Sequence, residues 1–317
     1  MTLTPHPPTT THSVVEVDGL TKRYGNAAAV DSLTFDVPAG QVVGLLGPNG
    51  AGKTTAMKML LGLVQPSSGR ATVLGATHGD IDYPEAVRRV GALIESPALY
   101  ERLSARHNLE LQARALGLPN DPKRIDELLD LVDLTNRAGD KARTYSLGMK
   151  QRLGIAVAMI GRPELVILDE PANGLDPAGI VEIRELLRRL PDMGTTVLVS
   201  SHQLSEVQQA CDRLVILAEG RLIAAGTTEE ILAGDATSEW TVRVDPGEVV
   251  LAVDQCRSRG LTVTAQDHWS LNVTPPNDWT GRDINRLLVE AGVYAAELVH
   301  HTPTLEHAFL EMTGANQ

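Results

Sequence analysis

The stretch GPNGAGKTT, residues 47–55, places three glycines, a lysine and two threonines directly after the apolar run QVVGLL. The pattern G-x-x-x-x-G-K-[ST], between a strand and a helix, is typical of loops whose backbone N–H groups converge on phosphate oxygens. We therefore predict a nucleotide site in which Lys53 reaches the β and γ phosphates and Thr54 holds Mg²⁺. The residues expected to contact the nucleotide are Gly47, Pro48, Asn49, Gly50, Ala51, Gly52, Lys53, Thr54 and Thr55.

The run ELVILDEP, residues 164–171, indicates a buried strand that ends in two carboxylates. Such a pair often only solvates a loop. Beside a phosphate loop, however, Asp169 is placed to complete the Mg²⁺ shell, and Glu170 to polarise an attacking water as a general base. A phosphate loop alone leaves kinases, GTPases and ATPases open, and this second motif favours hydrolysis.

The run YSLGMKQRLGIAVA, residues 145–158, predicts a helix that begins after Ser146. The serine is a preferred N-cap, and the apolar residues Leu153, Val157 and Ile160 recur at helical spacing. Many helices start in this way, so the serine becomes notable only because it lies about twenty residues before the acidic pair.

Short β-branched runs alternate with helical patterns from VVEV at residue 14 to RLVILA at residue 213. This alternation predicts an α/β domain with a mainly parallel sheet. The run RLVILAEGRLIAAG breaks the pattern, because two short strands flank Glu219-Gly220 and indicate a hairpin. In this arrangement the phosphate loop and the acidic pair each follow a strand.

The character of the chain changes after residue 237. Segments 240–244, 261–264, 270–273 and 293–299 are predicted as strands, with helices at 248–259 and 283–291 and a final helix at 305–312. The order βαββαβ is that of a ferredoxin-like unit. We predict a disordered tail over 1–13, an ATPase-type domain over 14–236 and an accessory α+β domain over 238–317.

Composition limits the partners that this chain can have. Its formal net charge of -12 argues against nucleic acid, which selects for clustered Lys and Arg. No apolar run approaches the roughly eighteen residues of a membrane span, and the first residues lack the apolar segment of a signal peptide. Cys211 and Cys256 lie far apart without CxxC spacing, as in a reducing cytosol. His300, His301 and His307 lack convergent partners, so we predict no transition-metal site.

Five motifs together resemble a known family. GPNGAGKTT, YSLGMKQR, LVILDEP, GLDP and VSSH are similar, in order and spacing, to the nucleotide-binding subunit of ATP-binding cassette (ABC) transporters. The resemblance covers roughly residues 14–236 and implies a homodimer that closes around ATP. It further implies that Tyr24 stacks on adenine, that Ser146 and Gly148 contact the γ-phosphate held by the opposite subunit, that Asp176 links the two sites, and that His202 senses the γ-phosphate.

Two positions depart from the family pattern. The usual signature is Leu-Ser-Gly-Gly-Gln, whereas this chain has Tyr145-Ser146-Leu147-Gly148-Met149 and keeps the serine and the second glycine. The family generally has a glutamine where this chain has Glu95, a side chain expected to reach Mg²⁺ and the attacking water. Both departures resemble the exporter branch whose ATPase and membrane subunits are separate chains, including antibiotic self-resistance pumps.

The resemblance implies that the chain binds and hydrolyses ATP to drive an integral membrane permease, docked near residues 95–116 at the cytoplasmic face of the plasma membrane. The expected cargo is a drug, antibiotic or other hydrophobic compound. One alternative is a soluble ABC-type ATPase acting on ribosomes or DNA, although the second cassette or long insertion usual there is absent from this sequence. Another is an ATPase gated by a ligand bound to the domain at 238–317.

Overall fold

The computed structural model describes residues 12–202, 209–233, 239–265, 267–276 and 279–301. The chain divides into two compact units, Met1–Thr228 and Glu229–Gln317. The division comes before residue 237, where the sequence placed the boundary. Residues 1–11 of the predicted tail, the final helix predicted at 305–312 and His307 lie outside the described residues. No helix in the described ranges is both long and apolar enough to cross a bilayer.

The first unit is built on a six-stranded sheet in the order β10-β9-β3-β8-β7-β6. Neighbouring strands from β9 to β6 run parallel, and β10 pairs antiparallel with β9. The interior strands are almost wholly buried, as a sheet covered on both faces requires. The strands are β3 (Val42–Leu46), β6 (Val90–Leu93), β7 (Leu165–Leu168), β8 (Thr196–Ser201), β9 (Arg213–Ala218) and β10 (Arg221–Gly226).

A second, antiparallel sheet has the order β2-β1-β4-β5. The sequence counted the run at residue 14 among the strands of a mainly parallel sheet, and for that run the placement was wrong. Along β1 buried and exposed residues partly alternate, which fits a sheet with only one face against the core. The strands are β1 (Ser13–Tyr24), β2 (Ala27–Pro38), β4 (Ser68–Val73) and β5 (Ala76–Thr77).

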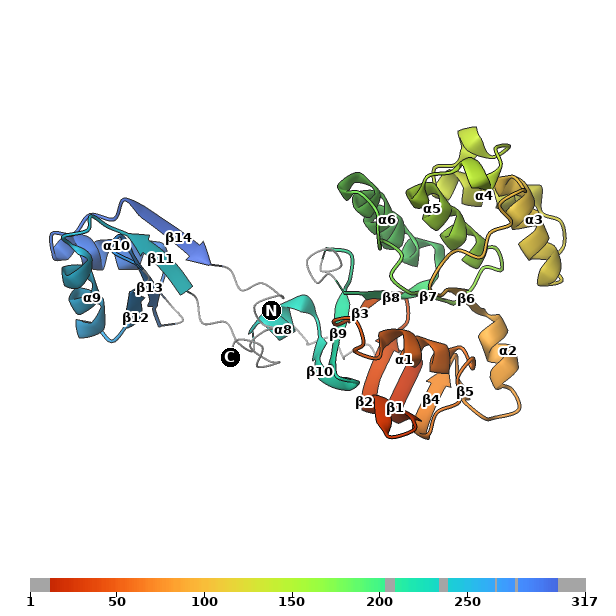
Figure 1. Cartoon of the computed structure of the whole chain (residues 1–317), viewed down its shortest axis with the longest axis horizontal. Helices are drawn as coiled ribbons and strands as arrows, with labels where there is room; N and C mark the ends of the chain where they lie inside the picture. Colours follow the sequence, from red (N-terminus) through yellow and green to blue (C-terminus); the bar gives the residue numbers. More distant parts are fainter. Residues whose placement is uncertain (1–11, 203–208, 234–238, 266, 277–278, 302–317) are drawn as a thin grey trace, which may run out of the picture. The chain divides into compact units, whose positions relative to one another are not determined.

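Helix α1 (Lys53–Leu60) lies between the two sheets (Figure 1). Its fully buried Met57 and Met59 join Leu45 of the parallel sheet and Leu33 of the antiparallel sheet in one hydrophobic core. Burial of a side chain of this size contributes about 1.5–3 kcal/mol. The helix that follows the phosphate loop is therefore held from both sides.

Helices α3 to α6 lie on the opposite side of the parallel sheet, whereas α2 lies on the same side as α1 and adds Tyr83 and Ala86 to its core (Figure 1). Leu109, Leu128 and Leu153, from three different helices, are fully buried. A short helix, α2 (Tyr83–Arg88), precedes β6. The remaining helices are α3 (Ala105–Ala115), α4 (Pro122–Leu131), α5 (Leu147–Ala158) and α6 (Pro177–Arg189).

The predicted hairpin is confirmed, and it supports the phosphate loop. Glu219 and Gly220 have φ values of 50° and 79°, as a two-residue turn of the I′ type requires. The N–H of Gly220 donates to the carbonyl of Ala51 at 3.2 Å, and its carbonyl accepts from the N–H of Asp31 at 2.8 Å. The turn thus joins the loop to the antiparallel sheet.

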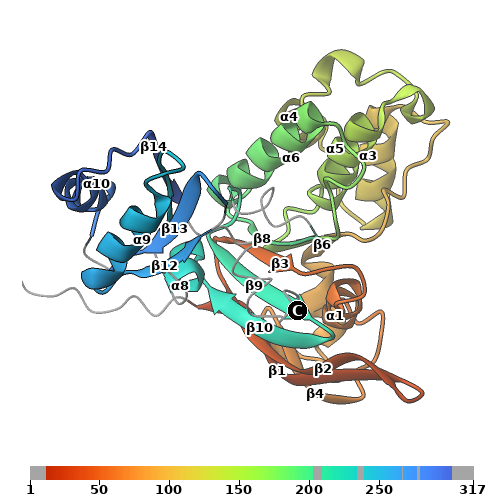
Figure 2. The same cartoon turned by 60° about the vertical axis from the view of Figure 1, so that its left-hand side comes forward.

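The second unit has the predicted βαββαβ order, after helix α8 (Thr228–Ala233). Its four strands are antiparallel in the order β12-β13-β11-β14, the ferredoxin-like arrangement. Helices α9 and α10 pack on one face of the sheet, with Cys256, Leu271 and Ile284 in the core (Figure 2). The elements are β11 (Glu239–Arg243), α9 (Val249–Ser258), β12 (Thr262–Ala265), β13 (Ser270–Thr274), α10 (Gly281–Glu290) and β14 (Glu297–His301).

Candidate active site

The loop at residues 47–52 joins β3 to α1, and its outer glycines are required by close backbone contacts. A Cβ on Gly47 would lie 2.2 Å from the carbonyl oxygen of Leu217, and one on Gly52 would lie 2.4 Å from that of Ala29. Gly52 is also the N-cap of α1, with no side-chain cap and no acidic residue in the first turn. The free N–H groups and the dipole of α1 therefore favour an anion at this point.

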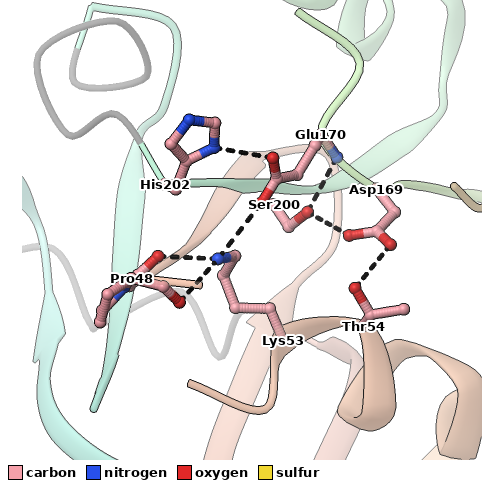
Figure 3. A network of polar contacts seen from close by, with 8 residues as sticks. Pro48, Lys53, Thr54, Asp169, Glu170, Ser200 and His202 are labelled. Atoms are coloured by element: carbon pink, nitrogen blue, oxygen red, sulfur yellow. Dashed lines mark hydrogen bonds and ion pairs between the residues drawn. The ribbon is translucent and has the colours of Figure 1, made fainter. Parts of the chain in front are cut away.

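Lys53 is buried, and its ammonium group points back toward the loop (Figure 3). Its Nζ donates to the carbonyl oxygens of Gly47 at 2.7 Å and Pro48 at 3.2 Å. It also forms an ion pair with Glu170, with 3.3 Å between Nζ and Oε1. A buried cation thus lies between the loop and the acidic pair, where phosphate charge is expected to bind.

The structure brings Thr54 and Asp169 together. Asp169 directly follows β7, and its N–H donates to the carbonyl of Leu93 at the end of the neighbouring β6. The Thr54 hydroxyl donates to Asp169 Oδ2 at 2.7 Å (Figure 3). Mg²⁺ prefers a few hard oxygen ligands and keeps several waters, so a hydroxyl and a carboxylate at this separation fit it.

Glu170 and His202 also meet, although 32 residues separate them in the chain. His202 Nδ1 lies 2.7 Å from Glu170 Oε2, while the other oxygen of the same carboxylate contacts Lys53 (Figure 3). A carboxylate held at both oxygens has a fixed orientation. An acid near the phosphate position, oriented in this way, can serve as a general base toward water.

The remaining predicted residues occupy exposed or capping positions. Tyr24, at the end of β1, is 54% exposed, and Lys22 Nζ lies 5.1 Å from the centre of its ring. Ser146 caps α5 by accepting from the N–H of Met149 at 3.2 Å, as the sequence predicted. Gly148 lies in the first turn of α5.

Asp176 caps α6 in the same way, accepting from the N–H of Gly179 at 2.9 Å. The rest of the predicted loop, Asn49, Gly50, Ala51 and Thr55, lies where the sequence placed it, between β3 and the first turn of α1.

Glu95 forms an ion pair with Lys58 of α1, and among the described residues it makes no hydrogen bond or ion pair with Thr54 or Asp169. Its Oε1 lies 2.6 Å from Lys58 Nζ, and its side chain is 67% exposed. The Lys58 ammonium lowers the pKa of Glu95, and the hydrogen bond to Glu95 raises the pKa of Lys58. The backbone of Glu95 has a φ of 67°, which is uncommon for a residue other than glycine.

Sequence reasoning missed two residues of this site, Lys58 and Ser200. Lys58 faces Glu95 because α1 passes the end of β6, and nothing in the spacing of the two residues signals that approach. Ser200 belongs to the motif VSSH, in which the sequence predicted a role only for His202. The signal was its polarity: it is a fully buried hydroxyl in a strand next to the acidic pair, and such a group needs a partner.

Comparisons with known proteins agree with this arrangement. The family model described as ABC transporter matches residues 30–173. An uncharacterized ABC transporter ATP-binding protein, YhcH of Bacillus subtilis, is 38% identical over 95% of this chain and 96% of its own length. The daunorubicin resistance ATP-binding protein DrrA3 of Streptomyces coeruleorubidus is 40% identical, and the bacitracin transport ATP-binding protein BcrA of Enterococcus faecalis is 42% identical, with the same two coverages.

Solved structures give the same result. An ATP-binding subunit of an ABC transporter superposes with a TM-score of 0.62 at 34% identity, over 70% of this chain and 93% of that one. The cbiO1 protein of Clostridium perfringens, part of the cbiONQ transporter complex, superposes with a TM-score of 0.65 at 27% identity, over 78% of this chain and 96% of that one.

An α/β ATPase fold that carries a phosphate loop, a paired Thr54 and Asp169, and a Glu170–His202 contact defines a nucleotide-hydrolysing P-loop protein. The chain belongs to the ABC transporter family, as an ATP-binding subunit with ATPase activity. Several of its relatives bear the names of antibiotic resistance or antibiotic transport proteins.

Proposed function

We propose that two copies of this chain close around two ATP molecules and drive a separate membrane permease that exports a drug, antibiotic or other hydrophobic compound. The observation that carries the proposal is a pair of contacts beside the phosphate loop: Thr54 hydrogen-bonds Asp169, and Glu170 contacts both Lys53 and His202. Relatives named for daunorubicin, bacitracin and linearmycin, matched over 95% of this chain, support export as the direction.

In each site, Lys53 would bind the β and γ phosphates and Glu170 would accept a proton from the attacking water. Mg²⁺, when bound by Thr54 and Asp169, supplies charge neutralisation at the phosphates. His202 uses Nδ1 toward Glu170, so its Nε2 is available to the γ-phosphate. We do not extend the metal role to Glu95, because Lys58 already pairs with it.

The second half of each site would come from the partner copy. Ser146 and Gly148 open helix α5, and a helix N-terminus is suited to the γ-phosphate. Asp176 would connect the two sites, and Tyr24 would stack on adenine. ATP then adds contacts that only the closed dimer makes, so its binding drives closure and hydrolysis reopens the pair.

Closure would act on the permease through residues 95–116, at the cytoplasmic face of the membrane. This segment runs from just after β6 through α3 and includes Tyr100, which precedes α3 and is 62% exposed. Exposed aromatic residues of this size are frequent in contacts between proteins.

The dimer can be tested with Glu170→Gln, which retains the shape of the side chain but removes the base. We expect this variant to form a dimer in size-exclusion chromatography with ATP and to remain a monomer with ADP. The control is Glu164→Gln, which changes a glutamate at the other end of β7 that pairs with Arg89. If Glu170→Gln stays monomeric at saturating ATP, the sandwich is refuted.

The composite site has its own test, in which helix capping is matched. Ser146→Ala and Ser104→Ala each remove a serine that caps a helix by accepting a backbone N–H at 3.2 Å. Each loss costs about 1 kcal/mol of stability. Only Ser146→Ala should abolish the ATP-dependent dimer and lower ATPase activity, and equal losses in both variants would contradict the role of Ser146.

One feature of the second unit favours an additional, regulatory role. A cavity of about 410 Å³ is lined by Arg259, Trp279, Asp283, Arg286, Leu287 and Glu290. Its volume falls within the range of roughly 300–1,000 Å³ typical of small-molecule sites. Tryptophan fluorescence would detect the binding of small molecules here, and ATPase assays of the full chain would test whether a bound molecule changes the rate; Arg286→Ala is the control.

A further inference from the structure

Ser200 of β8 lies at the centre of the contact network around the two acids, and no motif assigns it a role. Its side chain is fully buried. Its Oγ lies 2.5 Å from Asp169 Oδ1 and 2.9 Å from the backbone nitrogen of Glu170 (Figure 3). A single hydroxyl thus contacts both members of the acidic pair.

The direction of both hydrogen bonds follows from the groups involved. The N–H of Glu170 can only donate, so the oxygen of Ser200 accepts from it. The only hydroxyl proton of Ser200 is then directed to the carboxylate of Asp169. The other oxygen of that carboxylate accepts from Thr54 at 2.7 Å. With both oxygens bound, the Asp169 carboxylate cannot rotate without breaking a hydrogen bond.

The second contact holds a strained backbone. Glu170 has a φ of 48°, in the left-handed region that side chains other than those of Gly, Asn and Asp rarely adopt. Such a conformation persists where surrounding contacts impose it, and it is frequent at functional sites. The bond from the Glu170 N–H to Ser200 is a contact of this kind. It aims the side chain of Glu170 between Lys53 and His202.

The strand register explains why Ser200 has this position. Leu168, the last residue of β7, pairs with Val199 of β8. Ser200, the next residue of β8, is therefore level with Asp169, the residue that follows β7. Side chains alternate along a strand, so Ser200 and Ser201 point to opposite faces. Within the motif VSSH, the first serine is therefore the one that faces the acids, while His202 reaches Glu170 from the end of the strand.

We propose that Ser200 is a positioning residue for ATP hydrolysis, which fixes the Asp169 carboxylate and the backbone of Glu170 relative to each other. The proposal rests on the roles proposed above for Asp169 and Glu170. Ser200 acts through both acids and touches no phosphate. Removing a group that hydrogen-bonds to a metal ligand and orients it typically lowers metal affinity or activity by about 10- to 100-fold.

The test compares Ser200→Ala with Thr196→Ala in the purified full chain. Thr196 lies at the other end of β8, is also buried, and accepts a hydrogen bond from the N–H of Gly40 at 2.9 Å. Both variants lose one buried hydroxyl from the same strand, but only one loses it beside the acids. Three quantities are measured: the ATPase rate, the melting temperature, and the affinity for Mn²⁺ in the presence of ADP, from the electron paramagnetic resonance signal of free Mn²⁺.

We expect Ser200→Ala to lower kcat by about 10- to 100-fold and Mn²⁺ affinity by about 10-fold, with little change in metal-free ADP affinity. Thr196→Ala should lower only the melting temperature. Ser200→Thr, which keeps the hydroxyl, should recover most of the Mn²⁺ affinity. Wild-type rate and Mn²⁺ affinity in Ser200→Ala would overturn the proposal, as would equal losses in both alanine variants. If the proposed roles of the acids were wrong, Glu170→Gln would still hydrolyse ATP. That result is distinct from a failure of the proposal for Ser200.

Discussion

Gly52→Ala provides a direct test of how tightly the phosphate loop is packed. Gly52 has a φ of 98°, and an added Cβ would lie 2.4 Å from the carbonyl oxygen of Ala29, a backbone atom that cannot rotate away. Gly75, in the turn between β4 and β5, has a φ of 86°, and a Cβ there would meet nothing within 4 Å. In both variants the new alanine must adopt a left-handed backbone conformation, which costs about 1–2 kcal/mol. Only in Gly52→Ala does the added Cβ also overlap with a backbone atom.

Forcing one methyl group into a packed site costs about 1–3 kcal/mol. We therefore expect Gly52→Ala to lose about 2–5 kcal/mol and Gly75→Ala about 1–2 kcal/mol. In a unit of this size, the excess lowers the melting temperature by about 2–12 °C beyond the control. Calorimetry of the two purified variants measures this difference, and ATP affinity should fall only in Gly52→Ala. Equal melting temperatures would refute the close approach of the loop to Ala29.

Further predictions follow from other contacts. Tyr24→Ala should weaken ATP binding by about 2- to 10-fold in an equilibrium binding assay, while Tyr24→Phe should not, because the stacking face remains. Lys58→Met should raise the pKa of Glu95, measured by carboxyl NMR, because Lys58 lowers it in the wild type. The ion pair stabilises the folded protein at pH values above the pKa that Glu95 has in the unfolded chain. This stabilisation is lost as the pH falls through the lowered pKa of Glu95 in the folded protein. The melting temperatures of the wild type and of Lys58→Met should therefore converge in acid. Burial raises the pKa of Cys256 to about 11, so this thiol should resist alkylation at pH 8 until the second unit unfolds, as mass spectrometry would show.

Local patterns in the sequence were sufficient to predict those elements whose signals are local. The hairpin at Glu219-Gly220, the cap at Ser146 and the βαββαβ order of the second unit each depend on residues close together in the chain, and the structure contains all three. The prediction that the run at residue 14 belongs to the parallel sheet was wrong, because a local signal does not determine how strands pair. A β-branched run predicts a strand but carries no information about which strand becomes its neighbour.

The candidate site likewise contains residues that local motifs predict and residues that only tertiary packing brings together. The positions of Lys53 and Thr54 at the start of a helix, and of Asp169 and Glu170 at the end of a strand, could be predicted because each pair belongs to a short motif. The pair formed by Lys58 and Glu95 could not, because it joins a helix to a strand end 37 residues away through an approach that only tertiary packing sets. The contacts of Ser200 depend on the alignment of β7 with β8, and sequence periodicity leaves that register undetermined.

The order of the strands explains why β8 is central to the chemistry. The phosphate loop follows β3, the two acids follow β7, and β8 lies between these strands in the sheet. Parallel strands carry their carboxyl ends at the same edge, where ligands of open α/β sheets bind. A residue at the end of β8 can therefore reach both neighbours. His202 contacts the acid that pairs with Lys53, and Ser200 contacts the acid that accepts from Thr54. A shift of β8 relative to β7 would disturb both acids together, so the geometry of hydrolysis depends on the packing of these two strands.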